Sequence, residues 1–315
     1  MKIEGGNGRA PSRGAIVLAI TVLMAIWAVN FLVVKVGLRY LPALAFASFR
    51  IVAAGVFMVA IAPLCRRLAM FSAADPNEKF TARDLWTFAY LGFFGVSVNQ
   101  FCFTLGLRYT NVTHSSIIVG MAPIYTLTLA VLLRLERLTW RKAVGMAIAF
   151  TGVAILASAA GLSHHSPTLM GDAITVCGSL GFAMYVVLGK RVASTYNALT
   201  MTTWNFIFGS ALLLPVALQQ AVAMRFLSTW REVPWQAWAC VVFTGLLSST
   251  VAYLLYFWLL RYLEASQLAS FSYLLPVSAS GLSIVFLGER GSWMELVGGV
   301  LALLGVYWIE STRGR

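Results

Sequence analysis

The chain of 315 residues is 60% apolar and only 11% charged, and its mean hydropathy is +0.82. Soluble domains contain about 45–50% apolar and about 25% charged residues, so this composition excludes a soluble globular protein. The formal charge of +12 does not indicate nucleic-acid binding, because Lys and Arg stand in short clusters between apolar runs and form no basic stripe.

Apolar runs that are long enough to cross a membrane recur along the whole chain. A helix needs about 17–25 residues to span about 30 Å of hydrocarbon. The runs predict ten transmembrane helices, at 14–34, 43–63, 86–107, 112–133, 140–158, 170–189, 199–219, 235–259, 265–287 and 292–310. We therefore expect an all-α integral membrane protein.

The polar segments indicate how the chain is inserted. The apolar run after residues 1–13 is too long for a signal peptide and has no small-residue cleavage site, so we expect it to remain as the first helix. With a cytoplasmic N-terminus, about 16 Lys and Arg residues lie on that side and about 6 on the other. The positive-inside rule then predicts a multi-pass protein of the cell membrane with both termini cytoplasmic.

The sequence repeats itself once. A shift of 153 residues pairs Gly92 with Gly245, Leu107-Arg108-Tyr109 with Leu260-Arg261-Tyr262, Pro123 with Pro276, Glu136-Arg137 with Glu289-Arg290, and Trp140 with Trp293. At the front of each half, a shift of 155 residues pairs Trp27, Asn30 and Lys35 with Phe182, Tyr185 and Lys190. Each copy holds five predicted helices, an odd number, so the second copy must enter the membrane from the opposite side.

This pattern predicts two inverted five-helix repeats, related by a pseudo-two-fold axis in the membrane plane. We divide the chain into a cytoplasmic tail at 1–13, a first repeat at 14–158, an external loop at 159–169, a second repeat at 170–310 and a cytoplasmic tail at 311–315. Inverted repeats are characteristic of secondary transporters, which place a cavity on the axis near the midplane. The alternative is a gene duplication retained only for folding.

Ordered motifs mark each half. They are Trp27-Ala28-Val29-Asn30-Phe31 in the first helix, Phe49-Arg50 in the second, Leu107-Arg108-Tyr109-Thr110 at the opening of the fourth, and Pro123 to Glu136-Arg137 before the glycines of the fifth. With these motifs, which recur in the second half, the chain resembles the ten-helix branch of the drug/metabolite transporter superfamily, whose halves are called EamA domains. Within it, the chain is most similar to the amino-acid exporters of the YddG type.

The resemblance implies export of small organic solutes, such as amino acids or related metabolites. The resemblance does not identify an individual substrate, because His114 departs from the run of small residues that is usual in the family's fourth helix.

Equivalent positions of the two halves should both face a cavity on the pseudo-axis, so paired polar or aromatic residues are the candidates for substrate binding. The pairs are Trp27 with Phe182, Asn30 with Tyr185, Gln100 with Tyr253, Phe103 with Tyr256, and His114 with Gln267. Positions 27 and 30 are three apart and therefore share a helix face. The alternative is that the polar members hydrogen-bond between helices without a substrate role.

Two ionisable residues are expected at depth in the membrane. Arg50 lies about 12 Å into its helix, and it is either an anchor for a substrate carboxylate or a structural charge satisfied by backbone carbonyls or Glu289. His114 is either a proton-responsive group of the cavity or an interfacial histidine. We expect no metal or other cofactor, since His164-His165 is a lone pair in a polar loop.

The fifth and tenth helices carry small residues at matching spacing. These are Gly145, Ala149 and Gly152 in the fifth, and Gly298, Ala302 and Gly305 in the tenth. The spacing predicts close helix packing, either in a scaffold or at the interface of a homodimer.

The acidic residues bear on the class of protein. All 11 lie in loops or at helix ends, and no HExxH occurs, which argues against an intramembrane enzyme, although a Ser–His pairing with His114 stays open. Carriers of phosphorylated metabolites need paired basic residues, and Arg50 alone is a poor phosphate clamp. We therefore expect a secondary transporter of amino acids, hydrophobic metabolites or amphipathic drugs that works by alternating access.

The positions of the acidic residues also bear on how transport is coupled to an energy source. Membrane-embedded carboxylates commonly couple transport to protons, and none is predicted in a helix centre, so a facilitator or exchanger is expected. The alternative is a proton-coupled drug/metabolite antiporter that uses His114.

Overall fold

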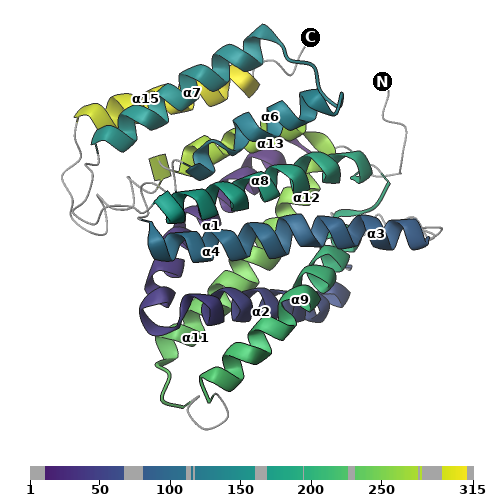
Figure 1. Cartoon of the computed structure of the whole chain (residues 1–315). Helices are drawn as coiled ribbons and strands as arrows, with labels where there is room; N and C mark the ends of the chain where they lie inside the picture. The colour runs from purple at the N-terminus through teal and green to yellow at the C-terminus, as the bar shows by residue number, and fades with distance from the viewer. Residues whose placement is uncertain are drawn as a thin grey trace.

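In the residues that it describes, the computed structural model of the chain contains helices and no strands (Figure 1). The described residues are 11–66, 81–110, 115, 118–159, 169–193, 195–225, 231–275, 277–278 and 293–310. Four sites singled out from the sequence lie outside them, namely His114, His164-His165, Pro276 and Glu289.

In the first half of the chain, a π-helical segment interrupts one long α-helix, and the other helices are continuous. Their bounds are α1 Arg13–Tyr40, α2 Ala43–Cys65, α3 Ala82–Leu91, the π-helical segment η1 Gly92–Val98, α4 Asn99–Tyr109, α6 Ala122–Leu132 and α7 Trp140–Ala159. α3, η1 and α4 follow one another without a gap and form one long helix.

The second half has a similar succession. Its elements are α8 Leu169–Val192, α9 Ala198–Ala223, α11 Trp235–Val242, the π-helical segment η2 Phe243–Val251, α12 Ala252–Tyr262, α13 Ala265–Ser270, the short 3-10 helix η3 Phe271–Tyr273, and α15 Trp293–Glu310. α11, η2 and α12 again form one long helix.

Local sequence sets where several helices begin and end. The Ser12 hydroxyl accepts a hydrogen bond from the backbone N of Ala15 at 3.2 Å and caps α1. The side-chain oxygen of Asn197 caps α9 by accepting from two backbone N–H groups of its first turn, at 2.7 and 3.1 Å. α1 ends at Tyr40, and Pro42, which cannot continue a helix, stands directly before α2.

Six helical stretches in the described ranges are long and apolar enough to cross a membrane. They are Arg13–Tyr40, Ala43–Cys65, Arg83–Tyr109, Leu169–Val192, Ala198–Ala223 and Trp235–Tyr262. Each contains one of the spans predicted from the apolar runs. The chain is therefore an all-helical, multi-pass membrane protein, while the count of ten crossings stays a prediction.

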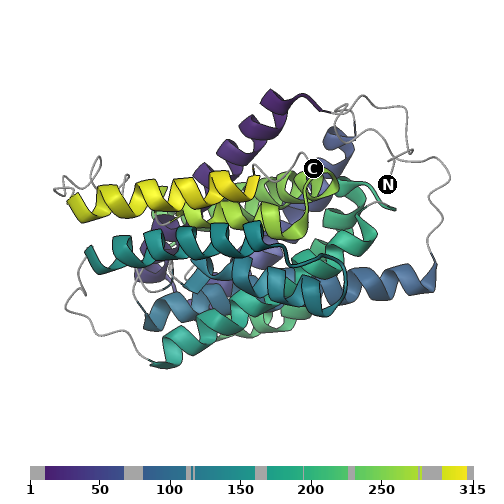
Figure 2. The ribbon, with the colours of Figure 1, turned by 90° about the horizontal axis from the view of Figure 1, so that it is seen from above.

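α7 and α15 lie side by side at one edge of the molecule (Figures 1 and 2). The contact is antiparallel and uses the predicted small residues, with Gly145 against Gly305 and Ile309, and Gly152 against Gly298 and Ala302. The two small-residue stripes thus contact each other within one chain, as in the scaffold interpretation. They give no support to the homodimer that was the other interpretation.

The remaining helices pack so that equivalent elements of the two halves meet. α2 packs against α9 at the opposite edge from α7 and α15, and α6 packs against α13 between these edges (Figure 1). α4 packs against α8, and α1 packs against the long helix of α11, η2 and α12. The interior between α1, α2, α4, α8 and α12 is where side chains from both halves come together.

The two π-helical segments stand at equivalent places, since Gly92 of η1 and Gly245 of η2 are paired in the repeat. At both glycines a neighbouring helix approaches closely: α9 at Gly92, and α2 at Gly245, where an added Cβ would lie 3.1 Å from the carbonyl oxygen of Arg50. π-helical turns inside α-helices occur frequently at functional sites. Here both lie next to the cavity described below.

Candidate functional site: a cavity between the two halves

A cavity of about 80 Å³ lies between the two halves of the chain. Its lining consists of Trp27, Asn30, Phe31, Arg50, Asn99, Gln100, Phe103, Val119, Ala122, Ser179, Phe182, Ser248, Tyr253, Ser272 and Leu275. These residues come from α1, α2, α4, α6, α8, η2, α12 and η3 and from the parts of the chain next to α6 and η3. A cavity of about 150 Å³ holds one benzene molecule, so this state has room for a few waters but not for an aromatic solute.

One wall of the cavity is aromatic. The ring of Trp27 lies edge-on to Phe182 of α8, with 5.7 Å between the centroids. It also lies 5.5 Å from Tyr256 and 6.2 Å from Tyr253, both of α12. The Trp27 Nε1 atom donates to the carbonyl oxygen of Ser248 in η2 at 3.3 Å. Trp27 therefore connects α1 with helices of the second half.

Tyr253 holds α12 against the first half. Its hydroxyl lies 3.0 Å from the carbonyl oxygen of Gly95 and 2.9 Å from Oδ1 of Asn99, and it can donate to either. The Asn99 Nδ2 atom in turn donates to the carbonyl oxygen of Gly178 in α8 at 3.0 Å. This chain of hydrogen bonds crosses between the halves beside the cavity.

Arg50 of α2 contributes a positive charge to the cavity wall. Its Nη1 donates to Oγ1 of Thr104 at 3.1 Å, and its Nη2 donates to Oε1 of Gln100 at 3.2 Å and to Oγ of Ser249 at 3.4 Å. The Ser249 Oγ lies 2.6 Å from the same Gln100 oxygen. The guanidinium is thus surrounded by neutral hydrogen-bonding side chains from α4 and η2.

Three polar atoms of the lining residues are buried without a hydrogen-bond partner in the described part of the chain: Nε of Arg50, Nε2 of Gln100 and Oδ1 of Asn30. Arg50 has no described carboxylate at ion-pair distance. Buried polar groups are normally satisfied, so unsatisfied ones in a cavity wall call for an explanation.

Six of the residues paired in the repeat as candidates for substrate binding line the cavity: Trp27, Asn30, Gln100, Phe103, Phe182 and Tyr253. They are brought together because α1, α4, α8 and α12 meet there. Whether they bind a substrate stays a proposal.

Two further candidates lie behind the wall. Tyr185 is 0% exposed and its ring centroid lies 5.6 Å from that of Tyr253, while Tyr256 is 1% exposed and packs against Trp27. Both support the aromatic wall and do not line the cavity.

Gln267 does not reach the cavity. It stands in the first turn of α13, where its Oε1 faces back to the backbone N of Glu264 at 3.4 Å in a capping box. Its repeat partner His114 lies outside the described residues. The expectation that Gln267 faces the cavity is therefore corrected, because the side chain caps its own helix.

Two of the three partners of Arg50, Thr104 and Ser249, were not predicted from the sequence. Thr104 is paired with Phe257 and Ser249 with Val96 in the repeat, so a search for positions that are polar in both halves passes over them. The available signal was the run of three hydroxyl residues at 248–250 inside an otherwise apolar helix.

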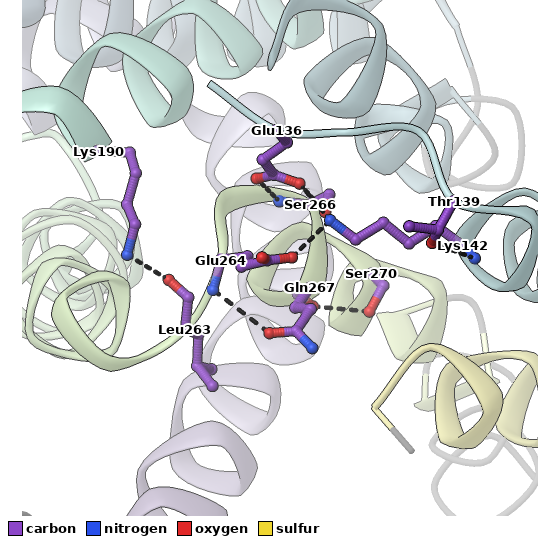
Figure 3. A network of polar contacts seen from close by, with 9 residues as sticks. All are labelled: Glu136, Thr139, Lys142, Lys190, Leu263, Glu264, Ser266, Gln267 and Ser270. Atoms are coloured by element: carbon purple, nitrogen blue, oxygen red, sulfur yellow. Dashed lines mark hydrogen bonds and ion pairs between the residues drawn. The ribbon is translucent and has the colours of Figure 1, made fainter. Parts of the chain in front are cut away.

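A polar network lies at one end of the bundle (Figure 3). Glu136, in the turn after α6, accepts hydrogen bonds from the backbone N of Ser266, at 3.1 Å, and from the Ser266 hydroxyl. Lys142 of α7 pairs with Glu136 at 2.7 Å and with Glu264 at 2.5 Å. The side chains of Glu136 and Lys142 are only 6% and 7% exposed. The network ties the turn between α6 and α7 to the start of α13.

A separate contact lies near the start of α8. The Thr110 hydroxyl, just beyond α4, donates to Oδ1 of Asp172 near the start of α8 at 2.7 Å. The network of Figure 3 includes Lys190 near the end of α8, whose Nζ atom donates to the carbonyl oxygen of Leu263. The two contacts therefore lie toward opposite ends of α8, and the cavity-lining Ser179 and Phe182 lie between them.

Comparison with known proteins identifies the family. A model described as the EamA-like transporter family matches the chain twice, over residues 14–158 and 169–311. The chain belongs to the EamA-like transporter family. The resemblance inferred from the sequence motifs is thereby confirmed, and this EamA-like chain is a transporter and not an enzyme.

Relatives along the full length agree with this assignment. An "Uncharacterized transporter" of Archaeoglobus fulgidus is 29% identical to this EamA-like chain over 298 residues, which cover 95% of the chain and 99% of the relative. A "Probable terminal-alkyne amino-acid exporter" of Streptantibioticus cattleyicolor is 27% identical over 301 residues, 95% of each protein. A solved crystal structure has the same fold, with a TM-score of 0.68 over 94% of this chain and 96% of that one, at 18% identity.

Proposed function

We propose that this EamA-like protein is a secondary transporter that exports amino acids or related small organic solutes by alternating access at the cavity. The observation that carries the proposal is one cavity, lined by both matched halves, with a separate polar contact toward each end of the bundle. The name of the Streptantibioticus relative, an amino-acid exporter, supports amino-acid export.

The proposed architecture is ten helices in two inverted repeats, at 14–158 and 170–310. In such an arrangement, the ends of the first and third helices and the start of the sixth lie on the same side of the membrane. The contact between Thr110 and Asp172 joins the end of the third to the start of the sixth and agrees with this. The contact between Glu136 and Ser266 joins the turn after the fourth to the start of the ninth, which belong to the other side. Both contacts support the inverted topology.

The size of the cavity suggests how solute moves. With space for a few waters, the cavity must widen before it accepts a solute, and the aromatic wall of Trp27 and Phe182 is what the solute displaces. Rocking of the two halves breaks the contact at one end while the other end stays closed. Each solute is thereby exchanged between the two sides without an open channel.

The lining supports a facilitator or exchanger. In the described part of the chain, the cavity wall contains no carboxylate that could carry a coupling proton. The competing function is a proton-coupled antiporter that uses His114, a residue outside the described part.

The proposed location is the bacterial inner membrane, with both termini and the 64–85 loop in the cytoplasm. Cysteines introduced at positions 75 and 165 should be labelled by a membrane-impermeant reagent from opposite sides. Labelling of both from the same side would contradict the inverted repeat.

Transport itself is tested with purified protein in proteoliposomes. We expect counterflow of a labelled amino acid, driven by unlabelled amino acid on the other side, without any ion gradient. If an imposed pH gradient drives uphill accumulation, and does so less well in His114→Gln, the antiporter is the correct function. If no amino acid shows either behaviour, amino-acid transport is refuted.

A further inference from the structure

Arg50 stands in the cavity wall with a positive charge and no negative partner among the described residues. Its side chain is 2% exposed, and the three oxygens reached by its Nη groups all belong to neutral side chains. We propose that Arg50 is the anion-binding group of the cavity and that the transported solute carries a carboxylate that pairs with it. This inference rests on the transport function proposed above and narrows its substrate class.

The electrostatics of Arg50 favour a bound anion. Desolvating an ion is expensive, and hydrogen bonds to neutral oxygens compensate only part of the loss of water. In Arg50 the compensation is also incomplete in number, because no acceptor in the described ranges reaches its Nε atom. A solute carboxylate supplies both the missing negative charge and further acceptor oxygens.

The charge of the cavity wall indicates which kind of anion fits. Arg50 is the one Lys or Arg among the described lining residues, so the cavity wall balances a single negative charge. A planar carboxylate with one charge and two oxygens matches one guanidinium group. A phosphate carries more charge and would leave part of it unbalanced. An organic cation would meet a positive wall without an acidic partner.

The rest of the wall suggests the remainder of the solute. Trp27 and Phe182 offer an apolar, aromatic surface to its body. Asn30, 6% exposed, has an unpartnered acceptor oxygen that suits a donor such as an α-ammonium group. An α-amino acid with an apolar side chain satisfies all three features.

The test begins with sodium acetate, because its single carboxylate is small enough for the cavity in its present state. The apparent unfolding temperature of the purified full-length protein is measured in acetate, in sodium chloride of equal concentration, and in acetamide as the neutral isostere. We expect unfolding a few degrees higher in acetate than in either control, since a ligand that binds the folded state stabilises it. Equal unfolding temperatures in all three would overturn the proposal.

Variants locate the effect. Arg50→Gln should abolish the difference between acetate and chloride, whereas Arg13→Gln, which alters an exposed arginine at the start of α1, should retain it. Arg50→Lys keeps the charge but loses the planar fork, so it should reduce the difference without abolishing it. If Arg50→Gln does not fold, Arg50→Lys decides, and an undiminished acetate effect in that variant would overturn the proposal.

Transport provides the separate test of the function. In counterflow, L-phenylalanine should outpace L-phenylalaninamide, in which a neutral carboxamide replaces the carboxylate, by at least about tenfold, because the amide cannot form the ion pair. Acetate stabilisation without counterflow would support the anion site and contradict the transport function. Counterflow of the amide as fast as that of the acid would support transport and contradict the anion site.

Discussion

Lys35 and Lys190 make the same contact in the two halves of the chain. The Nζ atom of Lys35 donates to the carbonyl oxygens of Leu107 and Thr110, at 3.1 and 3.2 Å, at the end of α4. The Nζ atom of Lys190 donates to the carbonyl oxygens of Leu260 and Leu263, both at 2.6 Å, and the contact with Leu263 is drawn in Figure 3. In each half, one ammonium group satisfies carbonyls that a helix end leaves without partners.

Replacing either lysine should therefore destabilise the protein to a similar extent. Lys35→Met and Lys190→Met each remove two charged hydrogen bonds at a helix C-terminus, for which we expect a loss of about 1–3 kcal/mol in the free energy of unfolding. Denaturation of the purified variants measures this. Arg13→Gln serves as the exposed control and should change stability by less than about 0.5 kcal/mol. Lysine variants as stable as that control would contradict the capping role.

Glu136→Gln and Asp172→Asn should open opposite ends of the protein. Glu136→Gln weakens a charged network worth about 1.5–3 kcal/mol per hydrogen bond, so the state open at that end should gain about tenfold or more in population. Asp172→Asn should do the same at the other end. The measurement is the rate at which a membrane-impermeant thiol reagent labels a cysteine placed at Ser179, in a background without the native cysteines.

The two variants are each other's control. Glu136→Gln should raise labelling of the probe from the side of Glu136, and Asp172→Asn from the side of Asp172. Faster labelling from the same side in both variants, or unchanged rates in both, would show that these contacts do not hold the ends closed.

Gly152→Ala and Gly305→Ala should loosen the α7–α15 pair. A Cβ on Gly152 would collide with the backbone of Ala302, and one on Gly305 would collide with Ala149. Overpacking of this kind costs about 1–3 kcal/mol, and more where backbone must move. Gly299→Ala on the same helix is the matched control, because its Cβ would meet one side-chain atom at an ordinary 3.6 Å. Thermal unfolding should separate the first two variants from the third, and equal effects would contradict the packing argument.

Asn30 and Tyr185 should respond differently to alanine, although they are paired in the repeat. Asn30→Ala removes an unpartnered oxygen, so stability should change by less than about 1 kcal/mol while counterflow falls. Tyr185→Ala removes a fully buried ring that packs against Tyr253 and Phe257, and should cost about 3–5 kcal/mol. Expression and unfolding temperature, measured beside counterflow, distinguish the two. Normal transport in Asn30→Ala would remove it from the proposed site.

The apolar runs predicted the positions of the long helices well, because each must match the thickness of a membrane. Their ends were less predictable. The first run was expected to stop at 34, whereas α1 continues to Tyr40. Lys35 looked like the edge of the membrane, yet its ammonium reaches the carbonyls at the end of α4 and can remain inside the protein. A single sequence does not distinguish a charged residue with a partner on another helix from a charged residue that marks the end of a membrane span.

The cavity was predictable only where the two halves agree. Pairing polar and aromatic positions found Trp27, Asn30 and Gln100, because equivalent helices converge on one interior. It could not place Gln267, whose orientation depends on the local cap of α13. The sequence likewise carries no visible signal for the π-helical turns, which depend on the approach of neighbouring helices at the glycines of η1 and η2.

The antiparallel contact of α7 and α15 joins the last helix of one family-matched half to the last helix of the other. Because both helices present the same Gly, Ala, Gly spacing, two identical copies of a single half could make this contact with each other about a two-fold axis. A covalent link between the halves is then unnecessary for their association. Fragments 1–159 and 169–315, produced from separate genes in one cell, should therefore co-purify and recover counterflow.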